Sequence, residues 1–164
     1  GTKRMTQMTD PHDGLVSFQE ALKAGEIKPR PCEKHKDLTL LLDDANGTSR
    51  LTYSLIGDDG SVKALAMYCP VDPIDGVVCF GVGYAVAEQY RKQGLSYEIV
   101  EKSIDELVLG FGRHMPHLYI EAVIGVDNHA SQKVAAKYLC NDPVRIIDEV
   151  SGLPALQYVS YRKC

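Results

Sequence analysis

The stretch from Val86 to Ser96 combines a glycine, two basic residues and a small hydroxyl residue immediately before a helical pattern. The first turn of a helix presents unpaired backbone N–H groups and the positive end of the helix dipole, and both favour a bound phosphate. Gly94 would let the backbone approach a phosphate closely, while Arg91 and Lys92 would add positive charge beside it. We therefore interpret the stretch as a pyrophosphate-binding loop, with an ordinary strand-to-helix connection as the alternative.

A strand must lead into this loop and a helix must follow it. The run from Val77 to Val86 is apolar and aromatic, which predicts a buried strand. From Leu95 onward, apolar residues recur at helical spacing with charged residues between them, and the pattern ends near Gly110 or Gly112. The loop is therefore expected at the joint between a strand and an amphipathic helix.

A second strand and helix follow the first pair. Residues 118–126 form another apolar run, which predicts a strand, and Asn128 is a favourable N-cap for a helix over about residues 129–139. Two runs with β propensity, at 144–150 and 155–161, flank a Ser-Gly-Leu-Pro turn and predict a closing hairpin.

The N-terminal third is expected to begin with a flexible arm at residues 1–13, because this segment is polar and carries a proline. Ser17 and Glu20 have the spacing of a capping box, which predicts a short helix that ends near Gly25. The strands that follow are expected at residues 37–42, 51–55 and 62–68. A helix end is the alternative for the first of these strands.

The composition indicates one globular domain. The chain has 164 residues, of which 45% are hydrophobic and 24% are charged, values that are typical of a single soluble domain with its own core. The order of the elements predicts an α/β fold, with a mixed and largely antiparallel central sheet of about six or seven strands flanked by about four helices.

Charge and cysteine content restrict the possible partners. The net charge of -4 disfavours a nucleic-acid partner, which would require clustered basic residues. No apolar run reaches the roughly 18 residues of a membrane span. The cysteines are odd in number and form no C-x-x-C pair, so we expect neither a disulfide framework nor a metal site, and a cytoplasmic location. They are Cys32, Cys69, Cys79, Cys140 and Cys164.

The loop also carries a family resemblance. Arg91-x-x-Gly94-x-Ser96 resembles the R/Q-x-x-G-x-G/A signature of the GNAT superfamily of acetyl-CoA-dependent N-acetyltransferases, with Ser96 where Gly or Ala is usual. The preceding segment 83–86 and the following Glu98 look like the branch that acetylates the N-termini of ribosomal proteins.

An independent segment resembles the same branch. Ile120-Glu121-Ala122, followed by Asn128-x-x-Ser131-x-x-Val134-x-x-Lys137, is similar to its strand-plus-helix motif at the same spacing. The resemblance covers residues 77–139. It implies a GNAT-like fold and a single acyl-CoA N-acyltransferase domain at residues 14–164.

The resemblance implies how acetyl-CoA, the acyl donor, would bind. In the family, the strand before the loop separates from the neighbouring strand, and the pantetheine arm lies where the two part. Backbone groups would bind pantetheine, the loop would hold the pyrophosphate, and the helix N-cap would hydrogen-bond the arm. The residues expected to bind the cofactor are Val86, Ala87, Arg91, Lys92, Gln93, Gly94, Leu95, Ser96, Asn128 and Ser131.

Two residues that family members often use are absent here. A glutamate is common near the middle of the strand that ends at Val86, but residues 81–83 are Gly-Val-Gly. A tyrosine is common seven residues after the N-cap asparagine, as the acid toward the thiolate, but this position is Ala135.

Four residues remain as candidates for catalysis, namely Ser131, Glu121, Tyr84 and Tyr138. The Ser131 hydroxyl could donate to the departing thiolate, or Ser131 could be a small residue that lets the helix pack. Glu121 could accept the amine proton, or it could point to solvent, because alternation places it opposite to its apolar neighbours. For Tyr138, a packing role is the main alternative.

By this resemblance, the expected reaction is acetyl transfer from CoA to a primary amine, by direct attack in a ternary complex. The acceptor would be a protein N-terminus or a small-molecule amine. The alternative is an acyl-CoA-binding module with little or no turnover, because the usual glutamate and tyrosine are absent. We expect no nucleic-acid or membrane partner, and an open edge in the final hairpin makes a homodimer possible.

Overall fold

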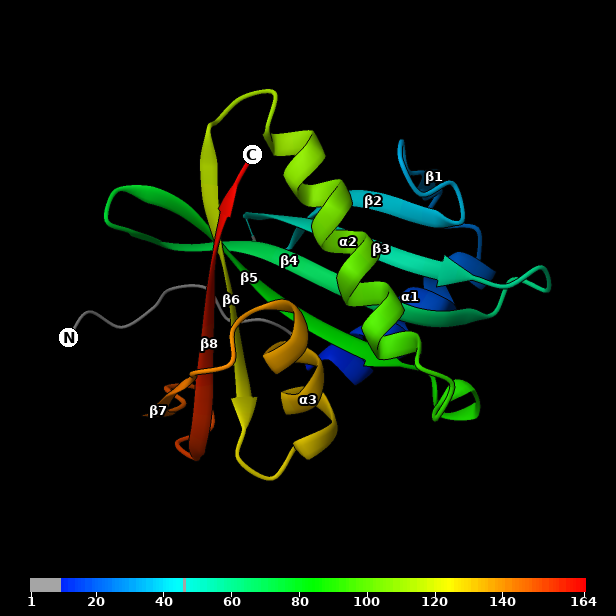
Figure 1. Ribbon diagram of the computed structural model, residues 1–164. Helices are drawn as coiled ribbons and strands as arrows, with labels where there is room; N and C mark the ends of the chain where they lie inside the picture. The colour runs from blue at the N-terminus through cyan, green and yellow to red at the C-terminus, as the bar shows by residue number, and fades with distance from the viewer. Residues whose placement is uncertain (1–9, 46) are drawn as a thin grey trace.

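Alternating apolar residues produce one sheet around which the chain is organised (Figure 1). The computed structural model describes residues 10–45 and 47–164. The strands are β1 (Arg30–Pro31), β2 (Leu38–Ala45), β3 (Thr48–Ile56), β4 (Val62–Ile74), β5 (Val77–Val86), β6 (His117–Gly125), β7 (Val144–Ile147) and β8 (Pro154–Lys163). They form an eight-stranded sheet in the order β1-β2-β3-β4-β5-β6-β8-β7. The α/β class with a mixed sheet is therefore confirmed.

Neighbouring strands of the described sheet are antiparallel, with β5 and β6 as the exception. Side chains alternate between the two faces. Tyr53 of β3 pairs with Ala66 of β4, and both residues belong to the larger core. Leu65 and Met67 of β4 belong to the smaller core on the opposite face. The sheet is therefore buried on both sides.

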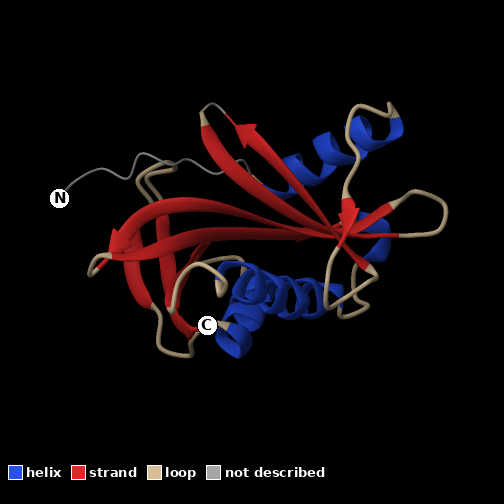
Figure 2. Ribbon diagram, turned by 90° about the horizontal axis from the view of Figure 1, so that it is seen from above, coloured by secondary structure: helices blue, strands red, loops and turns tan. Residues whose placement is uncertain are grey.

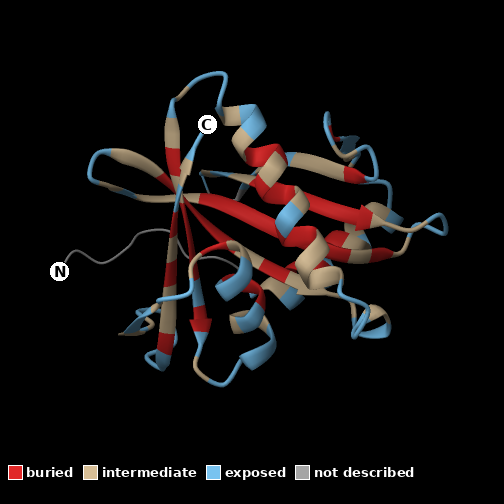
Figure 3. Cartoon of the chain, in the orientation of Figure 1, coloured by how far each residue is buried: buried red, intermediate tan, exposed pale blue. Residues whose placement is uncertain are grey.

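Three α-helices in the described residues cover the two faces: α1 (Pro11–Lys23), α2 (Leu95–Phe111) and α3 (His129–Tyr138). Figure 2 shows α1 on one face and α2 with α3 on the other. Ile99 and Leu107 of α2 are fully buried against the sheet, and buried residues are concentrated in the strands beneath this helix (Figure 3). The helix ends at the C-cap Gly112, as the sequence predicts.

The first helix begins earlier than expected. The Asp10 carboxylate accepts hydrogen bonds from the backbone N–H groups of His12 and Asp13, and Pro11 occupies the first turn. Ser17, which the capping-box pattern placed at the start, therefore lies inside α1. Residues 10–13 of the expected arm belong to the helix and its cap, whereas residues 1–9 lie outside the described residues.

The expected numbers of elements need correction. The structure has eight strands and, in its described part, three α-helices, against about six or seven strands and about four helices expected. The additional strand, β1, contains only two residues and includes Pro31, so it leaves no periodic pattern. A fourth α-helix has no counterpart among residues 10–45 and 47–164, although residues 88–90 form a short 3-10 turn. The uncertain segment 37–42 is confirmed as a strand, β2.

Candidate functional site

The parallel contact between β5 and β6 is short. The paired residues are Cys79 with Tyr119, Phe80 with Ile120, and Gly81 with Glu121. Beyond these pairs, β5 continues to Val86 alongside β4, and β6 continues to Gly125 alongside β8 (Figure 1). We call this point of separation the β5–β6 fork. Over residues 82–86 and 122–125, neither strand has a ladder partner across the fork in the described structure, so the backbone there can pair with an extended ligand.

The turn that follows β5 sets the start of α2. The Ala87 N–H donates to the Lys63 carbonyl at 2.8 Å, and the Ala87 carbonyl accepts from Tyr90 N–H at 2.9 Å. Lys92 and Gly94 then adopt positive φ values of 65° and 75°. These two residues in the left-handed conformation turn the chain into α2. Only the glycine adopts this conformation without backbone strain.

The N-terminus of α2 has the features of an anion site. Gly94 is the N-cap and makes no side-chain hydrogen bond to the first turn, so the N–H groups of that turn receive no side-chain cap. A Cβ at Gly94 would meet nothing within 4 Å, so space for a ligand remains next to the backbone. Arg91 and Lys92 are exposed and form no ion pair with the described residues. The predicted loop residues Gln93, Leu95 and Ser96 lie beside them on the same turn.

The first turn of α3 lies on the other side of the fork. The Asn128 Oδ1 atom accepts from Ser131 N–H at 3.2 Å, which confirms the predicted N-cap. The Tyr84 hydroxyl of β5 donates to the Ser131 carbonyl at 2.7 Å, so this ring spans from one strand of the fork to α3. Burial raises the pKa of Tyr84 well above its usual value, so the hydroxyl keeps its proton.

Glu121 occupies the apex of the fork. It is opposite Gly81 in the last parallel pair, and its side chain lies on the face opposite to Ile120 and Ala122. Of the two alternatives for Glu121, the structure excludes a solvent-exposed side chain, because the residue is only 5% exposed. The Gln157 Nε2 atom of β8 donates to its carboxylate at 3.2 Å. Gln157 was not found from the sequence, because its role depends on the pairing of β8 with β6.

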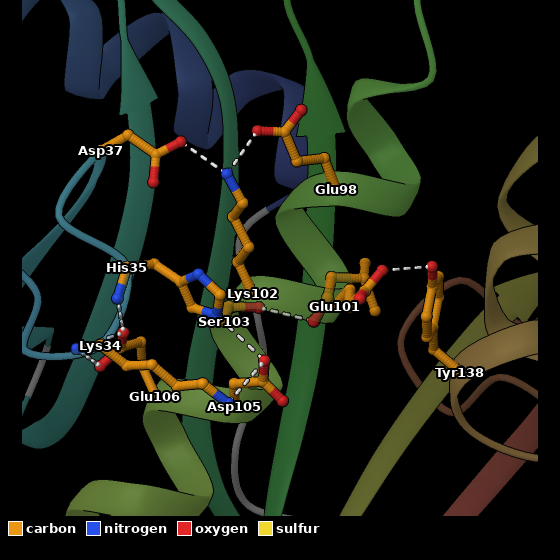
Figure 4. Close-up of polar contacts among 11 residues, drawn as sticks. Lys34, His35, Asp37, Glu98, Glu101, Lys102, Ser103, Asp105, Glu106 and Tyr138 are labelled. Atoms are coloured by element: carbon orange, nitrogen blue, oxygen red, sulfur yellow. Dashed lines mark hydrogen bonds and ion pairs between the residues drawn. The ribbon is translucent and has the colours of Figure 1, made fainter.

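Tyr138 lies away from the other candidates, at the C-terminal end of α3. Its hydroxyl donates to the Glu101 carboxylate of α2 at 2.6 Å (Figure 4). This hydrogen bond raises the pKa of Tyr138 to about 12. The ring also packs against Tyr97, with centroids 6.2 Å apart. The structure thus brings Glu121, Tyr84 and Ser131 to the fork and directs Tyr138 toward the outer side of α2.

The geometry agrees with the family comparison. Residues 16–139 match the family model described as "Acetyltransferase (GNAT) family". The chain belongs to this family. The recognition made from the two sequence motifs is therefore confirmed, and acetyl-CoA is the acyl donor that GNAT acetyltransferases generally use.

Solved structures of GNAT acetyltransferases resemble the chain. A GnaT-family acetyltransferase from Bordetella pertussis is 16% identical with a TM-score of 0.52, over 71% of this chain and 67% of that one. A chimera of the spermidine N-acetyltransferase SpeG from Vibrio cholerae and hSSAT is 8% identical with a TM-score of 0.50, over 68% and 66%. These two likenesses show the GNAT fold, and the chain spans about two thirds of each protein.

The acetyl transferase from Salmonella typhimurium that modifies the N-terminal serine of ribosomal protein L7/L12 is also similar. It is 18% identical with a TM-score of 0.47, over 70% of this chain and 64% of that one. No curated protein matches the sequence.

The described residues hold no cluster of three or more His, Cys, Asp or Glu side chains suited to a metal ion. Among the helices of the same part of the chain, none has the length and apolar character needed to cross a bilayer.

The Asn128 cap makes a testable contribution to stability. Asn128→Ala should lower the free energy of unfolding by about 1 kcal/mol, because the N–H of Ser131 loses its acceptor. Asn128→Asp keeps an acceptor at the same place and should remain within about 0.5 kcal/mol of the wild type. Urea denaturation followed by circular dichroism measures both values. Equal stability of the two variants would contradict the assigned cap.

Proposed function

We propose that the chain transfers an acetyl group from acetyl-CoA to a primary amine by direct attack in a ternary complex. The observation that carries the proposal is the β5–β6 fork, which ends at the buried Glu121 and opens toward the uncapped N-terminus of α2. A thioester placed at the fork would lie between the two groups that the reaction needs, namely an anion site for CoA and a carboxylate for the amine.

The loop supports the CoA-binding part of the proposal. The pyrophosphate would accept hydrogen bonds from the first N–H groups of α2, with Arg91 and Lys92 adding positive charge. The pantetheine amides would pair with the β5 backbone at Val86, and Asn128 would hydrogen-bond the arm from α3. Ala87 contributes less than expected, because its N–H and carbonyl already bond to Lys63 and Tyr90.

Glu121 is the proposed general base. The amine nitrogen attacks the thioester carbon, a C–N bond forms, the C–S bond breaks, and the amine proton must leave. Glu121 lies at the apex of the fork, and Gly81 beside it contributes no side chain that would block access. The hydrogen bond from Gln157 fixes the carboxylate in place.

Two hydroxyl groups are proposed as proton donors to the departing thiolate. Tyr84 and the side chain of Ser131 both lie where β5 faces the first turn of α3, and the Tyr84 hydroxyl bonds to the Ser131 carbonyl. The position of Ala135, one turn after Ser131, is fully buried and has no hydroxyl. The contacts of Tyr138 with Glu101 and Tyr97 favour a packing role for that tyrosine.

An acyl-CoA-binding module with little turnover is the second candidate function. It is favoured by the absence of a carboxylate at residues 81–83 and of a hydroxyl at Ala135. The proposed acceptor class is a primary amine, on a protein N-terminus or on a small molecule. Both candidate functions require CoA binding, so turnover separates them.

Thiol release from acetyl-CoA tests the transferase proposal directly. A panel of polyamines, aminoglycosides and short peptides with free N-termini should include acceptors that accelerate thiol release well above the hydrolysis rate. Mass spectrometry of the product should show a gain of one acetyl group on nitrogen. Binding of CoA without turnover on any amine would favour the binding module.

Substitution of Gly94 tests the phosphate loop. Gly94→Asp places a negative charge at the N-terminus of α2, so the affinity for CoA should fall more than about tenfold. Gly25→Asp is the matched control, because Gly25 has a φ of 73° against 75° at Gly94 and equally open surroundings. Calorimetric titration with CoA measures both, and equal affinities would overturn the site.

Glu121→Gln tests the proposed base. The amide keeps the shape but accepts no proton, so kcat should fall about 100-fold or more while KM for acetyl-CoA stays near the wild-type value. Glu106→Gln is the control, because Glu106 is also a buried glutamate and lies on α2 away from the fork. A wild-type kcat for Glu121→Gln would remove this residue from the mechanism.

A further inference from the structure

A cavity of about 670 Å³ lies at the C-terminal end of α2, between this helix and strands β1 to β3. We call it the α2–β2 cavity. It is separated from the phosphate loop by the length of α2, which is roughly 25 Å for a helix of this size. Its apolar walls are formed by Leu40, Leu42, Leu51, Tyr53, Leu109 and Phe111.

One position of α2 that faces the cavity has no side chain. Gly110 lines the cavity, and a Cβ added there would meet nothing within 4 Å. Leu42 and Leu109 remain 67% and 40% exposed at the cavity. Exposed aliphatic side chains around a cavity indicate a surface that a bound ligand would favourably remove from water.

The charged groups around the cavity favour an anion. Lys28 and Arg30 line it, and neither forms an ion pair with the described residues. Arg113 and His114 line the same cavity just after the end of α2, and the Arg113 charge is paired with Glu33. Basic side chains beside an apolar wall suit a molecule with an aliphatic part and one negative end.

The two acidic residues that line the cavity already have partners. Glu33 accepts from Arg113 Nη2 at 2.6 Å. The Glu106 carboxylate accepts from the backbone N–H groups of Lys34 and His35, at 2.6 to 3.2 Å. Glu33 is therefore neutralised by Arg113, and the Glu106 carboxylate is hydrogen-bonded but keeps its charge. Three basic residues (Lys28, Arg30, Arg113) against two acidic ones (Glu33, Glu106) leave the lining with a net positive charge, and Lys28 and Arg30 form no ion pair in the described structure.

The wall next to β1 is held in place by α2. Besides the bonds to Glu106, His35 Nε2 lies 3.0 Å from Asp105 Oδ2, and Lys102 Nζ lies 2.5 Å from Asp37 Oδ2 (Figure 4). These contacts fix the segment after β1 against two neighbouring turns of the helix, at residues 102–106. A ligand would therefore meet a site that is already formed, with little ordering cost.

We propose that the α2–β2 cavity binds a medium-chain aliphatic carboxylate, with the chain against the leucine wall and the carboxylate beside Lys28 and Arg30. The apolar wall alone would bind an aliphatic chain with any head group. The basic residues therefore make the cavity selective for a negatively charged head group. The site is independent of the proposed acetyl transfer, because it shares no residue with the fork or the phosphate loop.

Calorimetric titration with three ten-carbon amphiphiles tests this proposal, each below its micelle concentration and with CoA present at saturation. Decanoate should bind at least tenfold more tightly than decanol or decyltrimethylammonium. Saturating CoA keeps acyl chains out of the fork, and the quaternary ammonium cannot be acetylated. Failure of decanoate to bind, or equal affinity for all three compounds, would overturn the proposal without affecting the transferase assay.

Two variants test the location of the site. Gly110→Leu fills the cavity from a helical position with open space, so decanoate affinity should fall at least tenfold while the fold is retained. Ala136→Leu, at an exposed helical position on α3, is the matched control and should bind decanoate as the wild type does. The double variant Lys28→Glu, Arg30→Glu should lose the preference for decanoate over decyltrimethylammonium. Wild-type affinity in Gly110→Leu would place decanoate elsewhere and contradict the proposal.

Discussion

The structure depends on where the parallel ladder between β5 and β6 ends. Each strand is held on its other side by a long antiparallel partner, β4 for β5 and β8 for β6. The twist of the two antiparallel halves carries the strands apart after the pair of Gly81 and Glu121. On the side that faces the fork, the backbone of β5 and β6 therefore has no strand partner among the described residues. The amides of an extended ligand can supply the missing hydrogen-bond partners.

Burial of Glu121 links the closing hairpin to the fork. A carboxylate in a site that is only 5% exposed is costly unless it is hydrogen-bonded. Gln157 provides such a bond, and it reaches Glu121 because β8 pairs with β6 on the side away from the fork. The last hairpin is thus part of the proposed active site, although it lies outside the matched residues 16–139.

The sequence predicted the parts of the site that depend on local chemistry. The cap at Asn128 was predicted because an N-cap is specified within a few residues. At Gly94 the sequence indicated close approach of the backbone, and the structure adds that this glycine is the left-handed N-cap of α2. The burial of Glu121 was left open, because strand alternation places a side chain on a face but does not determine what covers that face. The start of α1 was misplaced because Asp10-Pro11 and Ser17-x-x-Glu20 are both favourable helix starts. The structure uses the earlier one, in which the Asp10 carboxylate caps the first turn.

Helix α2 runs from the proposed phosphate loop, to which its N-terminus belongs, to the α2–β2 cavity, which its C-terminal end lines. Between them, the Ser103 and Tyr68 hydroxyls lie 2.7 Å apart in a buried hydrogen bond, and Ile99 and Leu107 are fully buried on the sheet. Sliding α2 would break that bond and unpack those side chains together. A ligand at one end of the helix therefore has no low-energy motion of α2 through which to change the site at the other end. The helix therefore acts as a fixed support for the two proposed sites.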